Sequence, residues 1–418
     1  MTNHPKRVRE PLVHLTRRLN FSPKYAWCIR IGAFVLSILV CAIVTVIMTP
    51  KVGFGTFFGY LFEGAFGGMR AIWKLLRDTA ILLLLALAVT PCFKMRYWNI
   101  GGEGQALMGC FGAALIIRLL YGAMPLALLV FVALVVAICF AVVWAVLPAL
   151  FKAKWNTNET LLTLMFNYIA GCLSCYLIKK LDPGTTGSLS FLSQLAGVGN
   201  IGGNQFILTI LIVAVITVLM AIYLKYSKHG YEIAVVGESP NTARYVGINN
   251  KKVIIRTLVL CGVLCGIAGF IMVVLKDQSF KAEKATDTTL GGLGFTAVLV
   301  SWLANFNPLA MVLTSFLVVF ISMGGEHISA FGGLKSANYP SVLTGIFFFF
   351  IIATEFFINF KINFRKTGEI PQEPDDDVKA QDPPDPIETD AAGDAVDASA
   401  VEAAIDQPTV SVLEDKGV

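Results

Sequence analysis

The sequence predicts an all-α polytopic membrane protein with about ten transmembrane helices. Of its 418 residues, 56% are hydrophobic and 15% are charged, and the mean hydropathy is +0.70, whereas soluble domains are about one-quarter charged. The apolar residues gather in runs close to the ~20 residues that cross a bilayer. Because a single soluble core stops growing near ~250–300 residues, a soluble domain, a disulfide scaffold and a nucleic-acid binder all fit poorly.

The chain divides into an N-terminal arm, a membrane domain and an acidic tail. Residues 1–28 are too long and too charged for the n-region of a signal peptide, so the first span is expected to be an uncleaved anchor. The membrane domain covers residues 29–361. Its ten predicted spans are 29–49, 72–92, 100–120, 125–149, 159–179, 206–226, 254–276, 291–304, 309–323 and 341–361.

Charge separates the membrane domain from the tail. Residues 369–418 hold 15 acidic and two basic residues, net −13, which leaves 13 acidic and 31 basic residues, net +18, in residues 1–368. The tail is rich in Pro, Asp, Glu and Ala and cannot bury enough apolar surface to fold alone. We therefore expect a disordered tail.

The Lys and Arg residues favour a cytoplasmic location for both termini. With the N-terminus inside, the cytoplasmic segments of this cell-membrane protein carry clearly more basic residues than the outer segments. One stretch does not follow this bias: in this orientation it lies on the outer side, although it carries Arg70, Lys74 and Arg77. Their spacing suits an amphipathic helix that lies on the membrane surface.

No residue pattern indicates an enzyme, a metal site or a cofactor in this chain. The nine cysteines lie mostly within apolar runs, where cysteine behaves as a small hydrophobe. The sequence contains no P-loop, zinc-protease or nucleophile-elbow motif. The chain is therefore not expected to hydrolyse nucleotide itself.

Two glycine-rich segments, Asn99–Gln105 and Gly291–Phe295, interrupt the apolar pattern. Each lies between the first and second helices of a four-helix block, spans 2–5 and spans 7–10. The blocks are five spans apart, which predicts opposite topology and hence two inverted repeats with Gly-broken helices, as in many transporters. Broken helices leave backbone groups free, and within a membrane these must be covered by protein or by a water-filled path.

Polar side chains near the first break and at the start of the fifth span are the predicted substrate-pathway residues. Asn158 or Thr157 is expected to cap that span, with Glu159 in its first turn, while Asn167 lies deeper and needs a partner helix or a solute. Gly262 and Gly266 are expected to allow close helix packing. The predicted pathway residues are Asn99, Glu103, Gln105, Asn158, Glu159 and Asn167.

The longest patterned polar loop, about residues 228–253, is predicted to face the cytoplasm. Ser239 can cap a short helix with Pro240 at its first position, and Gly247 can end it. A short helix across the cytoplasmic face suits coupling to a soluble partner.

Four motifs, in this order along the chain, resemble those of ABC importer permeases. Asn99–Gln105 resembles N-I-G-A-E-G-Q, with Gly102 in place of alanine, and residues 158–170 resemble N-E-x-x-x-T-x-M-L-N-Y-I-A. The loop from Gly237 is similar to G-E-N-P-x-A-A-x-Y-x-G-I, with Ser239 and Thr242 in place of Asn and Ala, and residues 292–296 resemble G-x-G-F-x. The family is the branched-chain amino acid/simple sugar permease superfamily, and the group within it is the nucleoside type.

The resemblance implies the permease subunit of an importer for nucleosides or simple sugars. A separate ABC ATPase subunit would bind ATP and engage the loop, and a second permease subunit, identical or paralogous, would complete the pathway. An extracytoplasmic solute-binding lipoprotein would deliver the solute. The coupling residues that the resemblance implies are Gly237, Glu238, Pro240, Ala243 and Gly247.

Two other functions stay open on the residues alone. An ion-coupled secondary transporter would also have inverted repeats and broken helices, and Glu103, Glu159 or Glu355 could bind its ion. A membrane scaffold would use the acidic tail to recruit a partner. The loop motif argues against the first function, and the broken helices argue against the second.

Overall fold

The computed structural model describes residues 8–9, 13–17, 23–49, 52–184, 187–191, 193–195, 197–284, 287–333, 338–364 and 369–370. The chain forms two units, of which the first takes in Met1–Thr16 and Ile362–Val418. There β1 (Val8–Arg9) pairs with β7 (Glu369–Ile370), and β2 (Val13–Arg17) pairs with β6 (Phe360–Phe364). The predicted disordered tail lies outside the described residues from position 371 onward.

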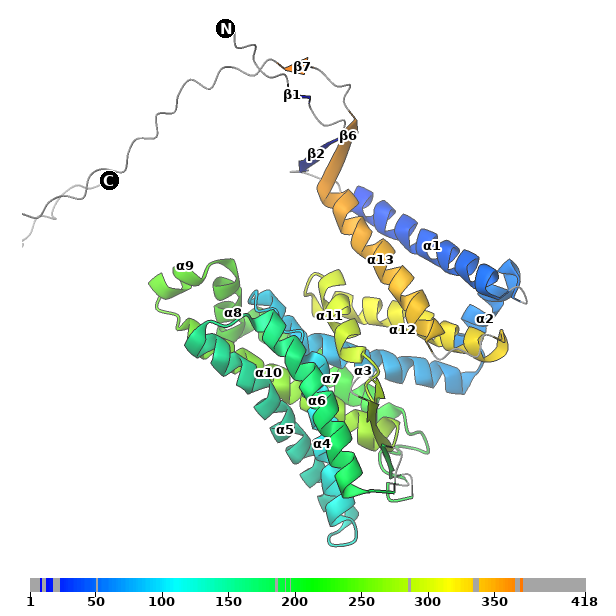
Figure 1. Cartoon of the computed structure of the whole chain (residues 1–418), viewed down its shortest axis with the longest axis vertical. Helices are drawn as coiled ribbons and strands as arrows, with labels where there is room; N and C mark the ends of the chain where they lie inside the picture. Colours follow the sequence, from blue (N-terminus) through cyan, green and yellow to red (C-terminus); the bar gives the residue numbers. More distant parts are fainter. Residues whose placement is uncertain are drawn as a thin grey trace, which may run out of the picture. The chain divides into compact units, whose positions relative to one another are not determined.

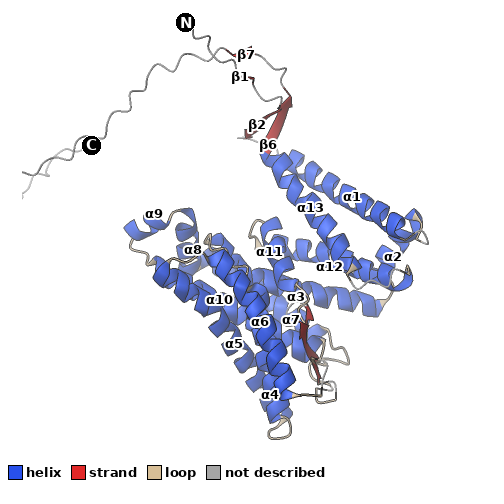
Figure 2. Ribbon diagram, in the orientation of Figure 1, coloured by secondary structure: helices blue, strands red, loops and turns tan. Residues whose placement is uncertain are grey.

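The second unit, Arg17–Lys361, is a bundle of apolar helices (Figures 1 and 2). Among the described residues, nine helices are long and apolar enough to cross a membrane. The helices are α1 (Pro23–Met48), α2 (Phe54–Phe66), α3 (Met69–Lys94), α4 (Gly102–Leu120), α5 (Leu126–Trp155), α6 (Glu159–Leu181), α7 (Ile207–Tyr226), α8 (Lys228–Glu238), α9 (Pro240–Tyr245), α10 (Asn250–Phe270), the π-helix η1 (Ile271–Lys276), α11 (Leu293–Leu303), α12 (Pro308–Phe331) and α13 (Tyr339–Asn359). A small antiparallel sheet joins β3 (Ser188–Ser190), β4 (Ser279–Lys284) and β5 (Asp287–Thr288).

All ten predicted segments are helical, and nine of them lie in helices long enough to span. The exception is the eighth: α11 has 11 residues, about half the length that a bilayer requires. The ninth is longer than predicted, because α12 continues through Gly324, Gly325 and Glu326 to Phe331. The shorter helices α2 and α8 are not among the predicted segments.

The predicted separate surface helix around Arg70, Lys74 and Arg77 is wrong, because these residues form the first turns of α3, one continuous helix from Met69 to Lys94. Arg70 is exposed and Lys74 is partly exposed, but Arg77 is buried. Arg77 is 7% exposed, because its guanidinium pairs with Asp78 at 3.0 Å and lies over the Phe206 ring, 5.2 Å from the centroid. Charge partners thus allow a basic side chain to enter a buried helix end.

Helix packing follows the two predicted blocks, α3–α6 and α10–α13. The first helix of each block packs on the second and third helices of the other block. Thus α3 packs on α11 and α12, and α10 packs on α4 and α5. A Cβ built at Gly262 would lie 2.7 Å from Val142 Cα, and one at Gly266 would lie 2.6 Å from Ile138 Cα. The predicted role of these two glycines in close packing is therefore confirmed.

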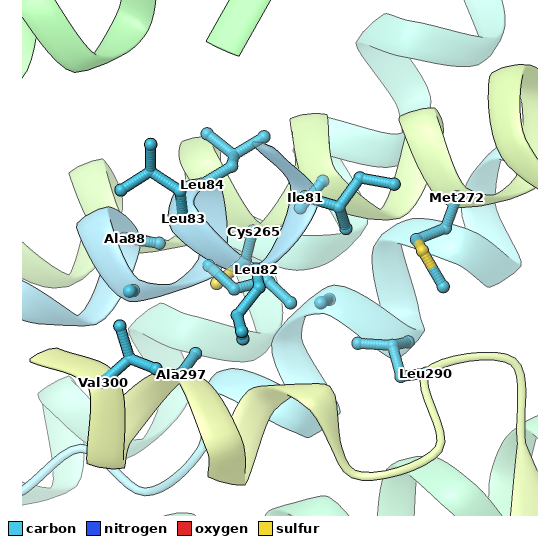
Figure 3. Close-up of a cluster of buried hydrophobic side chains, with 14 of the residues drawn as sticks. Ile81, Leu82, Leu83, Leu84, Ala88, Cys265, Met272, Leu290, Ala297 and Val300 are labelled. Atoms are coloured by element: carbon cyan, nitrogen blue, oxygen red, sulfur yellow. The ribbon is translucent and has the colours of Figure 1, made fainter. Parts of the chain in front are cut away.

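The core beside the candidate site is formed by buried side chains of α3, α10, η1 and α11 that pack against one another. Figure 3 shows Leu82 of α3 and Cys265 of α10 in the same buried cluster as Ala297 and Val300 of α11. The two glycine-rich segments reach this core from separate connections. Asn99–Gln105 leads from α3 into α4, and Gly291–Phe295 leads from β5 into α11. Contrary to the prediction, they do not interrupt helices; each one precedes a helix and supplies its first residues, for α4 and α11 respectively.

Candidate functional site

Two helix N-termini meet at one buried carboxylate, Glu103. The side chain lies in the first turn of α4, and the residue is 8% exposed. Its Oε1 accepts a hydrogen bond from Gly292 N at 3.0 Å, and its Oε2 accepts one from Gly294 N at 2.6 Å. These two N–H groups open α11, where a helix has no internal acceptors for them. The carboxylate thus faces the positive ends of two helices and ties them together.

Glycine is required on the α11 side of this contact. Gly292 has φ +86°, in the left-handed region that favours glycine. A Cβ at Gly294 would lie 2.4 Å from Glu103 N, closer than atoms of two backbones can approach. The glycines therefore let the two helix ends touch.

On its other side, the start of α4 is held by α6. Asn167 Oδ1 accepts from Gly104 N at 2.9 Å, and Asn167 Nδ2 donates to Ile100 O at 3.0 Å. The Thr163 hydroxyl accepts from Ile100 N at 3.2 Å. The partner that Asn167 needs is therefore the backbone that leads into α4.

A third set of contacts joins the same segment to α10. Gln105 Nε2 donates to Asn99 Oδ1 at 3.2 Å, and Gly101 N donates to the same oxygen at 3.0 Å. The Cys261 thiol donates to Gln105 Oε1 at 3.2 Å and accepts from Asn99 Nδ2 at 3.3 Å. We call this whole set of contacts, which joins α4 to α6, α10 and α11, the α4 junction.

The structure thus gathers four of the six predicted pathway residues, Asn99, Glu103, Gln105 and Asn167, in the α4 junction. The other two lie apart. Asn158 caps α6, as predicted, by accepting from Leu161 N at 3.2 Å. Glu159 pairs with Lys152 Nζ at 2.8 Å.

One cavity, of about 540 Å³, lies beside the C-terminal end of α3 and borders α8 and α9. The Tyr97 hydroxyl is buried there and has no hydrogen-bond partner among the described residues, and burial raises its pKa. Glu159 is the acidic lining residue. The basic lining residues are Arg96, Lys152, Lys154, Arg244 and Lys251.

A second cavity, of about 310 Å³, lies near the other end of α3. Lys276 Nζ lies 3.9 Å from Asp78 Oδ1, and both side chains are at least four-fifths buried. Lys276 ends the π-helix η1, and π-turns occur frequently at functional sites. This pair is not among the predicted site residues, although Asp78 lies inside the predicted span 72–92. The other polar and aromatic lining residues include Phe295, Thr296, Ser322, Glu326, Ser341, Thr344 and Phe348.

The two cavities flank the α4 junction. Asp78 lines one and Met95 lines the other, and 17 residues of helix separate them by about 25 Å. Tyr97 of the first cavity is two residues from Asn99, and Gly291 and Leu293 of the second adjoin Gly292. A polar path between the cavities would therefore pass the junction.

The predicted coupling loop contains two helices, α8 and α9. Ser239 Oγ accepts from Thr242 N at 3.2 Å, Pro240 begins α9, and Gly247 has φ +84°, so the predicted helix and both its ends are confirmed. Ala243 is buried, whereas Glu238 and Pro240 are exposed. Gly237 packs so closely on α3 that a Cβ there would lie 2.2 Å from Lys94 O.

At the start of α8, His229 connects three helices. Its ring hydrogen-bonds the Tyr223 hydroxyl of α7 and lies 3.5 Å from Thr257 Oγ1 of α10. Burial lowers the pKa of His229, so the ring is neutral at pH 7. The pair α8–α9 is therefore attached to both α3 and α10.

An arrangement of long apolar helices with polar cavities at both ends of a buried helix is typical of a membrane transport protein. The chain belongs to the family "Branched-chain amino acid transport system / permease component", whose model matches residues 71–352. It is thus a multi-pass protein embedded in a membrane.

Three curated relatives each match most of their own length. The nucleoside ABC transporter permease protein NupB of Lactococcus lactis is 27% identical over 320 residues, which cover 73% of this chain and 86% of that protein. The glucose ABC transporter permease protein TsgB13 of Haloferax volcanii is 27% identical and covers 77% and 85%. The guanosine ABC transporter permease protein NupP of Bacillus subtilis is 25% identical and covers 78% and 93%.

Proposed function

We propose that this chain is the permease subunit of an ABC importer that carries nucleosides, with simple sugars as the second solute class. The family membership gives the transport role, and two of the relatives named above carry nucleosides by name while one carries glucose. The observation that carries the proposal within this chain is the pair of polar cavities on either side of the α4 junction.

The cavity near Asp78 has the chemistry of a site for a neutral polar solute. Phe295 and Phe348 offer aromatic faces to a base or a sugar ring. The Asp78 carboxylate can accept hydrogen bonds from sugar hydroxyls, and the lining hydroxyls can both donate and accept. The acidic lining residues Asp78 and Glu326 both have basic partners: Asp78 lies near Arg77 and Lys276, and Glu326 pairs with Lys74. This pairing favours a solute without net charge.

The orientation that we propose puts α8–α9 and both termini in the cytoplasm of a cell-membrane protein. The basic lining of the cavity near α9 supports this orientation by the positive-inside rule. At the opposite end, the basic side chains of Lys74 and Arg77 pair with Glu326 and Asp78. An ATPase subunit would then dock on α8–α9, and a solute-binding lipoprotein would dock on the other face.

In the mechanism that we propose, the α4 junction alternately closes and opens the path between the cavities. A second permease subunit, identical or paralogous, would form the other wall of that path. ATP acts on the ATPase partner. ATP binding shifts the pathway from one state to the other only if the ATP-bound ATPase has a different affinity for each of the two states. The helices α8 and α9 transmit that difference through Gly237 to α3 and through His229 to α10.

The arrangement does not favour ion coupling. Each carboxylate oxygen of Glu103 accepts a hydrogen bond from a backbone N–H group, and Glu159 is paired with Lys152. The side chain of Glu355 lies outside those that the structure describes. The scaffold alternative depends on the tail beyond residue 370, which also lies outside the described residues.

The substrate assignment is tested by uptake in cells that carry or lack this gene. We expect labelled uridine or guanosine to accumulate in the first strain and to be competed by unlabelled nucleosides more than tenfold better than by leucine. Competition by glucose alone would move the assignment to sugars. Uptake that no nucleoside or sugar competes would contradict the proposal.

A further inference from the structure

The cavity beside α9 has a strongly positive lining. Five of its lining residues are basic and one, Glu159, is acidic. Two of the basic residues are engaged: Lys152 Nζ pairs with Glu159 at 2.8 Å, and Lys154 Nζ lies 4.6 Å from the centroid of the Trp155 ring. The basic residues that remain, which we call the three cations, are Arg96, Arg244 and Lys251.

The three cations come from separate parts of the chain. Arg96 follows α3, Arg244 lies in α9, and Lys251 lies in the first turn of α10. All three residues are exposed, and within the described part of the chain none of their side chains forms an ion pair or a hydrogen bond. Glu238, at the end of α8, does not line the cavity. Uncompensated positive charge around one cavity favours an anionic ligand.

The backbone holds Arg96 in a conformation that arginine seldom adopts. Its φ is +58°, in the left-handed region. Its N–H donates to Phe93 O at 2.9 Å, and the Tyr97 N–H donates to Cys92 O at 2.9 Å. These two bonds form a Schellman helix end, at which glycine is the usual residue in the left-handed position. The turn itself therefore does not explain an arginine there, whereas a ligand for its side chain does.

Two buried polar atoms of the cavity residues lack a partner. The Tyr97 hydroxyl and Asn250 Oδ1 are buried without a hydrogen bond among the described residues. Asn250 Nδ2 is already used, because it donates to Pro240 O at 2.9 Å. The hydroxyl can donate to an anionic oxygen, whereas the amide oxygen needs a donor. Because buried polar atoms without partners are costly, a ligand with both kinds of group would satisfy them.

A phosphate ester of a nucleoside combines these features. A phosphate monoester carries three acceptor oxygens and nearly two negative charges at neutral pH, and a guanidinium can bind it through two parallel hydrogen bonds. A carboxylate offers one charge and two oxygens. The hydroxyls and N–H groups of a nucleoside supply the donor that Asn250 Oδ1 needs. The volume of about 540 Å³ lies within the range of small-molecule sites, about 300–1,000 Å³.

We propose that the cavity beside α9 binds a nucleoside monophosphate, with its phosphate at the three cations. The nucleoside part and the cytoplasmic side rest on the function proposed above. Transfer of a phosphoryl group from ATP to a hydroxyl of the imported nucleoside, with release of ADP and a proton, would make this ligand. Bound beside Gly237 and Pro240, it would occupy the inner end of the path. A high level of the phosphorylated product would therefore slow further uptake.

Photolabelling tests the location of the ligand. The full chain, with any co-purifying partners, is placed in phosphatidylcholine nanodiscs and irradiated with a radiolabelled azido derivative of uridine monophosphate. We expect label in the peptides that contain residues 95–97 or 236–254, and competition by uridine monophosphate at least tenfold better than by uridine. Label in the ATPase partner alone, or equal competition by uridine, would refute the site.

The outcome separates this inference from the proposed function. Absence of binding together with normal nucleoside uptake by cells would overturn the nucleotide site alone. The label could also report a lipid phosphate, which has the same chemistry. Nanodiscs that contain phosphatidylglycerol decide between the two: label that persists supports the soluble nucleotide, and label that phosphatidylglycerol abolishes would assign the cavity to a lipid head group and overturn the proposal.

Variants test the three cations. Lys251→Gln should bind uridine monophosphate about tenfold more weakly, because it loses one hydrogen bond between charged groups. Arg96→Gly should weaken binding to a similar extent without lowering the melting temperature, because glycine suits the left-handed turn. Lys252→Gln is the matched control: Lys252 is the next residue of α10, is also exposed and does not line the cavity. Equal binding by Lys251→Gln and Lys252→Gln would contradict the proposal.

Discussion

Glu103→Gln should reduce uptake tenfold or more while the protein still inserts into the membrane. The carboxylate accepts two hydrogen bonds from α11, through Oε1 and Oε2. A glutamine side chain has one acceptor oxygen, so its NH₂ group would face a backbone N–H. One buried N–H then loses its partner, which costs about 1–3 kcal/mol.

The loss of charge acts in the same direction. A negative charge near a helix N-terminus contributes roughly 0.3–2 kcal/mol, and Glu103 serves two such ends. Because about 1.4 kcal/mol corresponds to a factor of ten, the closed α4 junction should become at least tenfold less populated relative to its open form. Initial uptake rates of labelled nucleoside and the melting temperature in detergent measure both consequences.

A matched control is Glu63→Gln in α2. Glu63 is exposed and outside the family match, so it should keep wild-type uptake and stability. If Glu103→Gln behaves like Glu63→Gln in both measurements, the junction has no role in transport.

Gly237→Ala should uncouple ATP hydrolysis from uptake. The added methyl group would lie 2.2 Å from Lys94 O, so α8 must move away from α3, and overpacking of this kind costs about 1–3 kcal/mol. We expect uptake to fall at least tenfold, whereas the ATPase activity of the purified complex persists. Hydrolysis and uptake are measured in the same reconstituted preparation.

Two further variants make this result interpretable. Gly59→Ala has no atom within 4 Å of the new Cβ and should behave like wild type. Glu238→Arg changes an exposed side chain of α8 without changing its packing, and it should also uncouple hydrolysis from uptake. Normal uptake in both Gly237→Ala and Glu238→Arg would show that coupling does not pass through this region.

Local signals made much of the fold predictable. Apolar runs mark the spans because length and hydrophobicity alone decide whether a helix crosses a bilayer. Caps are equally local: Asn158 and Ser239 each bond an N–H three residues ahead. The short α2 and α8 were missed because neither has a run of spanning length, and α12 was shortened because Gly324 and Gly325 resemble a helix end.

Long-range contacts limited the prediction of the site. Asn167 and Ile100 are 67 residues apart, and Glu103 and Gly294 are 191 residues apart, so no local pattern identifies them as partners. The burial of Arg77 likewise depends on Phe206, which immediately precedes α7. Sequence alone identified the polar residues at the start of α4, but it could not decide whether they bind solute or the chain itself.

The most direct test of the proposed function is ATP-driven uptake by the reconstituted complex. The tagged full chain would be purified in gentle detergent with its co-purifying proteins and placed in vesicles loaded with ATP, with the solute-binding protein and labelled uridine outside. We expect an ATPase subunit to co-purify and uridine to accumulate with ATP and without an ion gradient. A folded chain that purifies alone and transports uridine only with a proton or sodium gradient would contradict it.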